Sequence, residues 1–203
     1  MSKNITIEKT FSSAIQNHQK NNFKAAEDLY NQILEVDPNH IKTIFFLGTL
    51  LVQTKNFGKA KQMLQKTIQA QPNNVDAHNN LGVVFKEFEE FQKAKDCFEK
   101  VIQILPNHVD ALNNLGNVFK QLGEPRKAIN YYQKAIESEP SYIGAHYNLM
   151  EIFEKTNQII ELKNAILNAK TFLKDNPIIK LYEGILLNRN EKFVEAENCL
   201  KLI

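Results

Sequence analysis

Few side chains in this sequence are spaced for catalysis. The 203 residues include five histidines and two cysteines, and none of them falls in an HExxH or CxxC pattern. A glycine-rich phosphate loop and a nucleophile elbow are also absent from the sequence. The acidic run at Glu87, Glu89 and Glu90 is interpreted as a solvated helix end rather than as a paired acid and base. We therefore expect no enzymatic activity, no cofactor and no bound metal.

Paired asparagines are the polar side chains with the most informative spacing. Residues 79–86 read NNLGVVFK, and residues 113–120 read NNLGNVFK. Asparagine is a weak helix former, but its side chain offers two donors and an acceptor. Its recurrence in a helix suggests a hydrogen-bonding role. The alternative explanation is an AT-rich genome that supplies asparagine at exposed positions.

The two octets belong to a repeat of 34 residues. Two residue types recur at this interval: Pro38, Pro72, Pro106 and Pro140, and Ala26, Ala60, Ala94 and Ala128. A fixed period of this size is the signature of stacked structural repeats. With each proline at position 32, the repeats run over residues 7–40, 41–74, 75–108, 109–142, 143–176 and, in part, 177–203.

Each repeat has the pattern of two helices. Positions 4, 7, 8 and 11 lie on one arc of a first helix, and positions 20, 24 and 27 form the apolar stripe of a second. Turn residues such as Gly123 and Pro125 lie between the two, and the proline at position 32 stops the second helix. One hairpin cannot bury its apolar face alone, so the hairpins must stack. The sequence predicts an all-α solenoid forming a single domain over residues 1–203.

This pattern resembles the tetratricopeptide repeat family, which has Leu-Gly at positions 7–8, aromatic residues at 11 and 24, alanine at 20 and 27, and proline at 32. The resemblance implies a right-handed superhelical solenoid of helix-turn-helix units, with five full repeats and a partial sixth. It also implies protein–protein interaction as the function. The fifth repeat departs from the pattern at Met150, Leu162 and Lys174, where the family has glycine, alanine and proline. We expect an altered helix length or stacking angle there.

The first helix of each repeat has a second face, at positions 2, 5, 6, 9 and 13, which points away from the core. The family resemblance implies that this face lines a concave ligand groove, and the asparagines at position 6 resemble the ladder of O-linked N-acetylglucosamine transferases. We expect this groove to hold an extended polypeptide by its backbone amides. The expected groove residues are Asn79, Asn80, Asn113, Asn114, Asn117 and Asn148, with Phe45, Phe46, Tyr147 and Tyr182 as aromatic anchors. For Phe46, a role in helix packing is equally open.

Four histidines pair off by repeat position. They are His78 and His146 at position 4, and His40 and His108 at position 34. Equal positions two repeats apart lie about 20 Å from each other by helix-packing distances, which is too far to share a metal ion. We interpret these histidines as core or turn residues.

Charge and hydropathy indicate a cytoplasmic protein. The formal net charge of +2 gives no electrostatic reason to expect binding to nucleic acid or to an anionic membrane. The N-terminal sequence MSKNITIEKTF has no apolar signal-peptide region. The longest apolar stretch, from Ile44 to Val52, is shorter than the roughly 20 residues that cross a bilayer. We therefore expect a protein or peptide partner, with no nucleic acid and no membrane.

The sixth repeat stops at position 27 with Leu200, Leu202 and Ile203 still on its apolar pattern. Solenoids usually end in a polar capping element, so the sequence is expected to be either part of a longer protein or a chain whose end is an interface. Three hypotheses follow. The chain is a non-catalytic binding module, the N-terminal substrate-recognition arm of a larger glycosyltransferase-like enzyme, or a scaffold that forms a homodimer through its C-terminal repeat.

Overall fold

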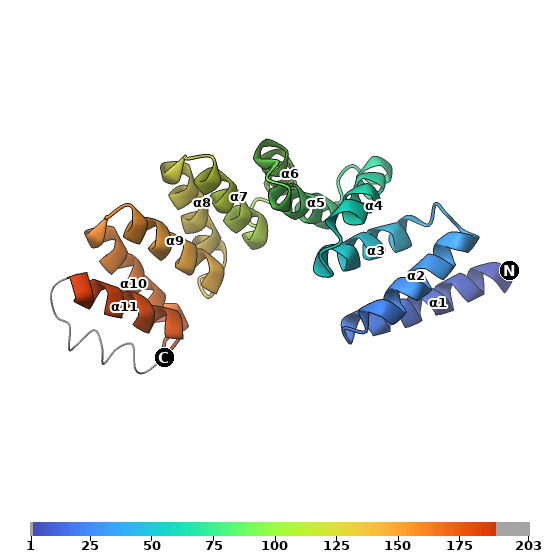
Figure 1. Cartoon of the computed structure of the whole chain (residues 1–203), viewed down its shortest axis with the longest axis horizontal. Coiled ribbons are helices and arrows are strands. Elements are labelled where there is room, and N and C mark those ends of the chain that lie inside the picture. Colours follow the sequence, from blue (N-terminus) through green and yellow to red (C-terminus); the bar gives the residue numbers. More distant parts are fainter. Residues whose placement is uncertain (1, 190–203) are drawn as a thin grey trace. The chain divides into compact units, whose positions relative to one another are not determined.

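A computed structural model describes residues 2–189, and side chains from Thr6 to Asn188. Every regular element in this range is an α-helix, which confirms the all-α prediction (Figure 1). The helices are α1 (Ser2–Gln19), α2 (Phe23–Val36), α3 (Ile41–Gln53), α4 (Phe57–Ala70), α5 (Val75–Glu87), α6 (Phe91–Ile104), α7 (Val109–Gln121), α8 (Pro125–Ser138), α9 (Ile143–Lys155), α10 (Ile159–Leu173) and α11 (Pro177–Arg189). The apolar end expected at Leu200, Leu202 and Ile203 lies outside the described residues.

Each odd-numbered helix from α1 to α9 packs against the even-numbered helix that follows it, as the hairpin pattern predicted. The helices group into two compact units, residues 1–106 and residues 107–203. The first unit contains α1 to α6, and the described part of the second contains α7 to α11.

The turn inside each hairpin has a left-handed residue at repeat position 15. These residues are Asn21, Lys55, Glu89, Gly123 and Asn157, with φ between 56° and 74°. In the third repeat the N–H of Glu89 donates to the carbonyl of Lys86 at 3.0 Å, and the N–H of Glu90 donates to the carbonyl of Phe85 at 2.9 Å. This double closure is the Schellman motif. It ends the first helix and reverses the chain over a few residues.

Position 34 caps the first helix of the next repeat. The Asn74 side chain accepts from the N–H of Ala77 at 2.9 Å. His40 and His108 do the same through Nδ1, at 3.3 Å and 3.2 Å. An N-cap acceptor satisfies one of the free donors at a helix start. The structure therefore confirms these two histidines as turn residues.

The fifth repeat differs where its sequence departs from the pattern. Its second helix, α10, has 15 residues, whereas α2, α4, α6 and α8 have 14 each. Without a proline at position 32, the helix continues for an extra residue to Leu173, and its C-cap residue Lys174 has a φ of 43°. The expected change in helix length is confirmed.

The two helices of a hairpin cross where the first helix has glycine at position 8. A Cβ atom on Gly82 would lie 2.6 Å from Cε1 of Phe98, and Phe98 is fully buried. The alanines at position 20 are also fully buried. Small residues at these two positions let the helices approach closely enough to enclose the aromatic ring at position 24.

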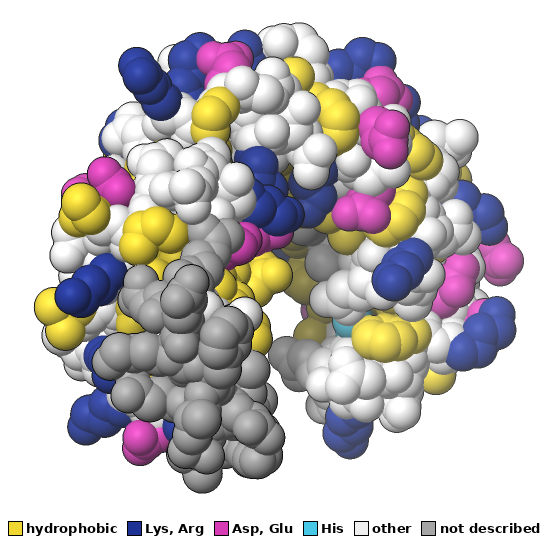
Figure 2. Space-filling view, turned by 60° about the vertical axis from the view of Figure 1, so that its left-hand side comes forward, with side chains coloured by type: hydrophobic (Ala, Val, Ile, Leu, Met, Phe, Trp, Pro, Cys, Tyr) yellow, Lys and Arg dark blue, Asp and Glu magenta, His cyan; other side chains and the backbone are white. Residues whose placement is uncertain are grey.

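The surface mixes charges of both signs. Figure 2 shows lysine and arginine side chains scattered among acidic and hydrophobic ones on the face in view, as expected for a formal net charge of +2. Among the described residues, none of the helices is both long and apolar enough to cross a membrane.

Candidate peptide-binding surface

In the first unit, the asparagine face joins α5 to α3. Nδ2 of Asn80 donates to Oγ1 of Thr49 at 3.1 Å, and Oγ1 of Thr49 donates to the carbonyl of Phe45 at 3.1 Å. The side chain at position 6 of one repeat is thus bound to position 9 of the repeat before it. One N–H of the Asn80 amide has a partner inside the protein, which leaves Oδ1 as an acceptor and the second N–H as a donor for a ligand.

Phe46 takes part in aromatic packing and also borders a cavity. Its ring packs edge-on against Phe45 and Phe11, with centroid distances of 5.2 Å and 5.5 Å. It also lines a cavity of about 380 Å³ between α1 and α3, together with Ile15 and Thr49. Phe11 is an additional aromatic residue of this cluster that the sequence analysis did not select.

In the second unit, Asn148 on α9 bonds to Asn113 on α7. Nδ2 of Asn148 donates to Oδ1 of Asn113 at 2.8 Å, and Asn113 is only 8% exposed. Asn117 is also engaged, because its Oδ1 accepts from the hydroxyl of the buried Tyr132 at 2.9 Å. Asn113 and Asn117 therefore stabilise the helix packing, and Asn148 again keeps Oδ1 for a ligand.

Asn79 and Asn114 have hydrogen-bonding capacity that their own units do not use. Oδ1 of Asn79 is buried and has no hydrogen-bond partner in the described part of the chain. Asn114 is half-buried and makes no side-chain hydrogen bond within residues 107–189. A buried acceptor without a partner costs stability.

The two predicted tyrosine anchors lie together, with ring centroids 6.2 Å apart. Tyr182 is only 4% exposed, whereas Tyr147 is 40% exposed. Burial raises the pKa of the Tyr182 hydroxyl above its ordinary value, so it stays protonated. Tyr147 is thus the ring that a partner can contact, and Tyr182 packs behind it.

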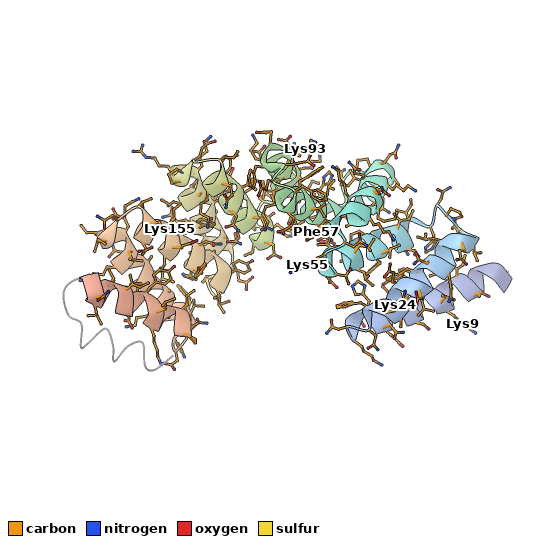
Figure 3. The ribbon with its side chains drawn as sticks, viewed as in Figure 1. Lys9, Lys24, Lys55, Phe57, Lys93 and Lys155 are labelled. Atoms are coloured by element: carbon orange, nitrogen blue, oxygen red, sulfur yellow. The ribbon has the colours of Figure 1, made fainter. Side chains whose placement is uncertain are left out.

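A charged cluster on the same face was not selected from the sequence. Glu151 on α9 pairs with Lys120 on α7 at 2.8 Å and with Lys155 at 2.5 Å. Lys155, labelled in Figure 3, comes from the last turn of α9. Burial acts to raise the pKa of Glu151, but hydrogen bonds from the two lysines outweigh it and hold the pKa below its usual value. The signal was a glutamate at position 9 of the fifth repeat and a lysine at position 12 of the fourth.

Each of the two histidines at position 4 joins its helix by a hydrogen bond to the loop that precedes the helix. Nε2 of His78 donates to the carbonyl of Pro72 at 2.9 Å, and Nε2 of His146 donates to the carbonyl of Pro140 at 2.8 Å. The interpretation of these histidines as core or turn residues is confirmed. Among the described residues, no group of three or more His, Cys, Asp or Glu side chains could hold a metal ion.

Comparison with solved structures shows the same fold. The crystal structure of MamA has 24% sequence identity and a TM-score of 0.67, covering 90% of this chain and 96% of that one. PilF of Pseudomonas aeruginosa has 16% identity and a TM-score of 0.80, covering 98% and 90%. YrrB, described as a tetratricopeptide repeat protein with an unusual peptide-binding site, has 18% identity and a TM-score of 0.64, covering 85% and 89%.

The sequence comparisons give the family. A search against curated proteins found no significant match. Models of the tetratricopeptide repeat match residues 18–82 and, as two successive repeats, residues 75–108 and 109–142. The matched segments together run from residue 18 to residue 142, which is more than half of the chain. The chain belongs to the tetratricopeptide repeat family.

Proposed function

We propose that this protein is a non-catalytic interaction module that binds an extended polypeptide segment on the asparagine face of its first helices. The observation that supports this most directly is the shared arrangement of Asn80 and Asn148. Each donates through Nδ2 to the preceding repeat and keeps Oδ1 as an acceptor. Family membership supports the general role, and the structurally similar YrrB is a repeat protein with a peptide-binding site.

Free acceptors at position 6 select backbone N–H groups as their ligand. Neighbouring first helices are expected to lie roughly 10 Å apart by helix-packing distances. A peptide in polyproline-II conformation repeats every three residues, which is about 9 Å. Within the second unit, Asn114 and Asn148 would therefore bind N–H groups three residues apart. Such contacts read the backbone, so they tolerate varied peptide sequences.

Aromatic residues beside the asparagines supply the apolar part of the binding. In the first unit, the cavity lined by Phe46 is of a size to receive an apolar side chain. In the second, the exposed ring of Tyr147 offers a flat apolar surface with a polar tip. Each unit thus combines an amide acceptor with one aromatic contact.

The proposal is tested by selecting a twelve-residue peptide from a random library on the intact chain and then measuring its affinity for an N80A/N114A/N148A variant. We expect at least tenfold weaker binding. Loss of two inter-repeat hydrogen bonds costs about 1 kcal/mol each, so binding is measured well below the unfolding midpoint, with helicity checked by circular dichroism.

The matched control is N31A/Q65A/N130A, which changes three exposed amides on α2, α4 and α8. We expect this variant to bind the peptide as tightly as the parent protein does. Unchanged affinity in the N80A/N114A/N148A variant would reject the asparagine face as the binding surface.

The two other hypotheses from the sequence are not part of this proposal. The likeness to glycosyltransferase-linked repeats is supported only by the asparagine positions. Self-association was assigned to Leu200, Leu202 and Ile203, which lie outside the described residues.

A further inference from the structure

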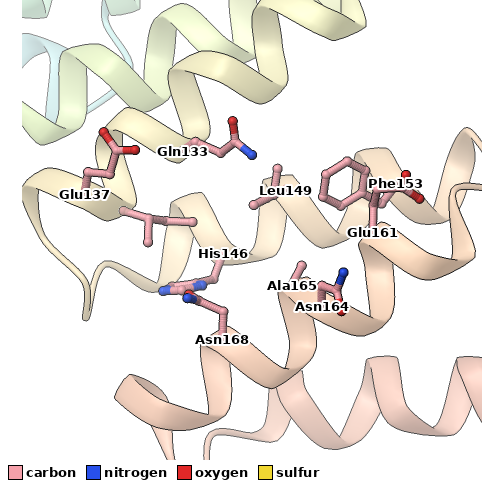
Figure 4. Close-up of a pocket in the computed structure, with 10 residues that line it drawn as sticks. Gln133, Glu137, His146, Leu149, Phe153, Glu161, Asn164, Ala165 and Asn168 are labelled. Carbon is pink, nitrogen blue, oxygen red and sulfur yellow. The ribbon is translucent and has the colours of Figure 1, made fainter.

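A cavity of about 500 Å³ opens among α8, α9 and α10 in the second unit. Figure 4 shows His146, Leu149 and Phe153 of α9 lining it between the two neighbouring helices. His146 and Asn148 are two residues apart on α9, about 200° around the helix. The cavity is therefore on the side of α9 away from the asparagine face, and it is separate from the proposed peptide surface.

One side chain that lines the cavity is smaller in the fifth repeat than at the same position of the other repeats. Ala165 lies at repeat position 23, which holds Cys97 in the third repeat and Tyr131 in the fourth. Leu149 and Phe153 line the apolar side of the cavity, with 7% and 6% of their surfaces exposed. The space is wide enough to admit one long side chain from a partner.

At one repeat position beside the cavity, the fifth repeat has a negative side chain where the two preceding repeats have a positive one. Position 19 is Lys93 in the third repeat and Lys127 in the fourth, but it is Glu161 in the fifth. Glu137 on α8 provides a second carboxylate, and none of the residues lining this cavity is a lysine or arginine. In a chain with 25 basic residues, this local excess of negative charge favours a cationic ligand.

An acceptor on the wall of the same cavity is unused. His146 is 1% exposed, and its Nε2 is bonded to the carbonyl of Pro140. A carbonyl only accepts, so Nε2 carries the proton and Nδ1 of the neutral ring is an acceptor. In the described range this Nδ1 forms no hydrogen bond. Figure 4 shows the ring of His146 beside Asn168 at the margin of the cavity.

We propose that this cavity binds an arginine side chain of a protein partner. The guanidinium has five N–H donors in a fixed plane, which suits acceptors spread over three helices better than a point-like ammonium does. Carboxylates form its strongest hydrogen bonds. Its methylene groups would pack on Leu149, and its flat face would lie on the ring of Phe153.

The test is an NMR titration of the intact chain with N-acetyl-arginine amide, and with N-acetyl-citrulline amide as an uncharged analogue of the same shape. We expect saturable shifts of the backbone amides of residues 133–137 and 161–168, with a dissociation constant on the order of millimolar. Citrulline amide should bind at least tenfold more weakly. Equal binding of the two probes, or shifts scattered over surface carboxylates without saturation, would overturn the proposal.

Two variants, each with two glutamates replaced by glutamine, distinguish binding in the cavity from general electrostatic attraction to the protein. The E137Q/E161Q variant keeps side-chain shape and changes two exposed residues, so the fold should be retained, and we expect at least tenfold weaker binding of arginine amide. The control E27Q/E35Q removes the same charge from α2 and should bind like the parent protein. If both variants lose affinity equally, the attraction is not specific to the cavity.

Discussion

Asn80 and Asn148 share repeat position 6, and each donates through Nδ2 to the preceding repeat. The 34-residue period and the helical angle predicted that they share a face. They did not predict the bonds, because the acceptors differ in type: a threonine hydroxyl at position 9 in one case and an amide at position 5 in the other. Which atom of an asparagine is left for a ligand depends on packing distances that a sequence pattern does not contain.

The close helix crossing at Gly82 gives a testable prediction about a single residue. Its missing Cβ would lie 2.6 Å from the ring of Phe98, and Phe98 is fully buried and has no room to move aside. We expect Gly82→Ala to lower the free energy of unfolding by about 2 kcal/mol through overpacking, measured by urea denaturation. Adding Phe98→Leu should recover part of that loss.

Gly58 is the matched control for this substitution. It lies near the start of α4, and a Cβ atom there would meet no atom within 4 Å. Gly58→Ala should leave stability unchanged or raise it by up to about 1 kcal/mol, since alanine is the better helix former. Equal effects at the two glycines would show that the helices do not cross closely at Gly82.

The ends of the helices follow the repeat positions closely, including those of the irregular fifth repeat. The prolines at position 32 predicted where the second helices end, and the departures of the fifth repeat predicted an altered helix length or stacking angle, of which the structure shows a longer α10. The left-handed turn residue at position 15 was not predicted, because only Gly123 among the five is glycine. The four others adopt a positive φ at an energetic cost that the Schellman hydrogen bonds offset.

Glu89 is one of these strained turn residues, with a φ of 58° and an exposed side chain. Glycine adopts this conformation without steric cost, so Glu89→Gly should raise the free energy of unfolding by about 0.5–1 kcal/mol. Thermal unfolding followed by circular dichroism measures it. Gln65→Gly, inside α4 and exposed, should instead destabilise by about 1 kcal/mol; a loss at both positions would contradict the turn geometry.

The salt-bridge cluster between α7 and α9 makes stability depend on pH. Because the folded pKa of Glu151 is below its usual value, its contribution is complete above the unfolded pKa of about 4.3. That contribution is lost as the pH falls through the lower folded pKa. Between pH 7 and pH 3, the Glu151→Gln variant should therefore lose less free energy of unfolding than the parent protein does. The difference between the two losses should be less than about 1 kcal/mol, because solvent screens the ion pair.

Urea denaturation at the two pH values measures this difference. Glu35→Gln, exposed on α2, is the control and should show the pH dependence of the parent protein. An identical pH dependence in the Glu151→Gln variant would mean that the cluster does not stabilise the packing of α7 against α9.

At the scale of the whole molecule, the repeat period alone predicted the all-α hairpin fold, because 34-residue self-similarity leaves few other architectures. The cavity beside α9 could not be predicted in the same way. It depends on the small side chain at Ala165 and on the three helices around that position. Function could be predicted from the sequence only in part. The family indicates a protein partner, whereas the chemistry of binding depends on which acceptors the packing leaves unused.

The most direct test of that chemistry is an N-methylation scan of a peptide selected on the intact chain, with affinity measured for each methylated form. If asparagine acceptors bind backbone N–H groups, methylation at every third residue should weaken binding at least tenfold, while alanine substitution outside the aromatic contacts changes it less than threefold. The opposite pattern, with side-chain changes decisive and N-methylation tolerated throughout, would contradict backbone recognition by the asparagines.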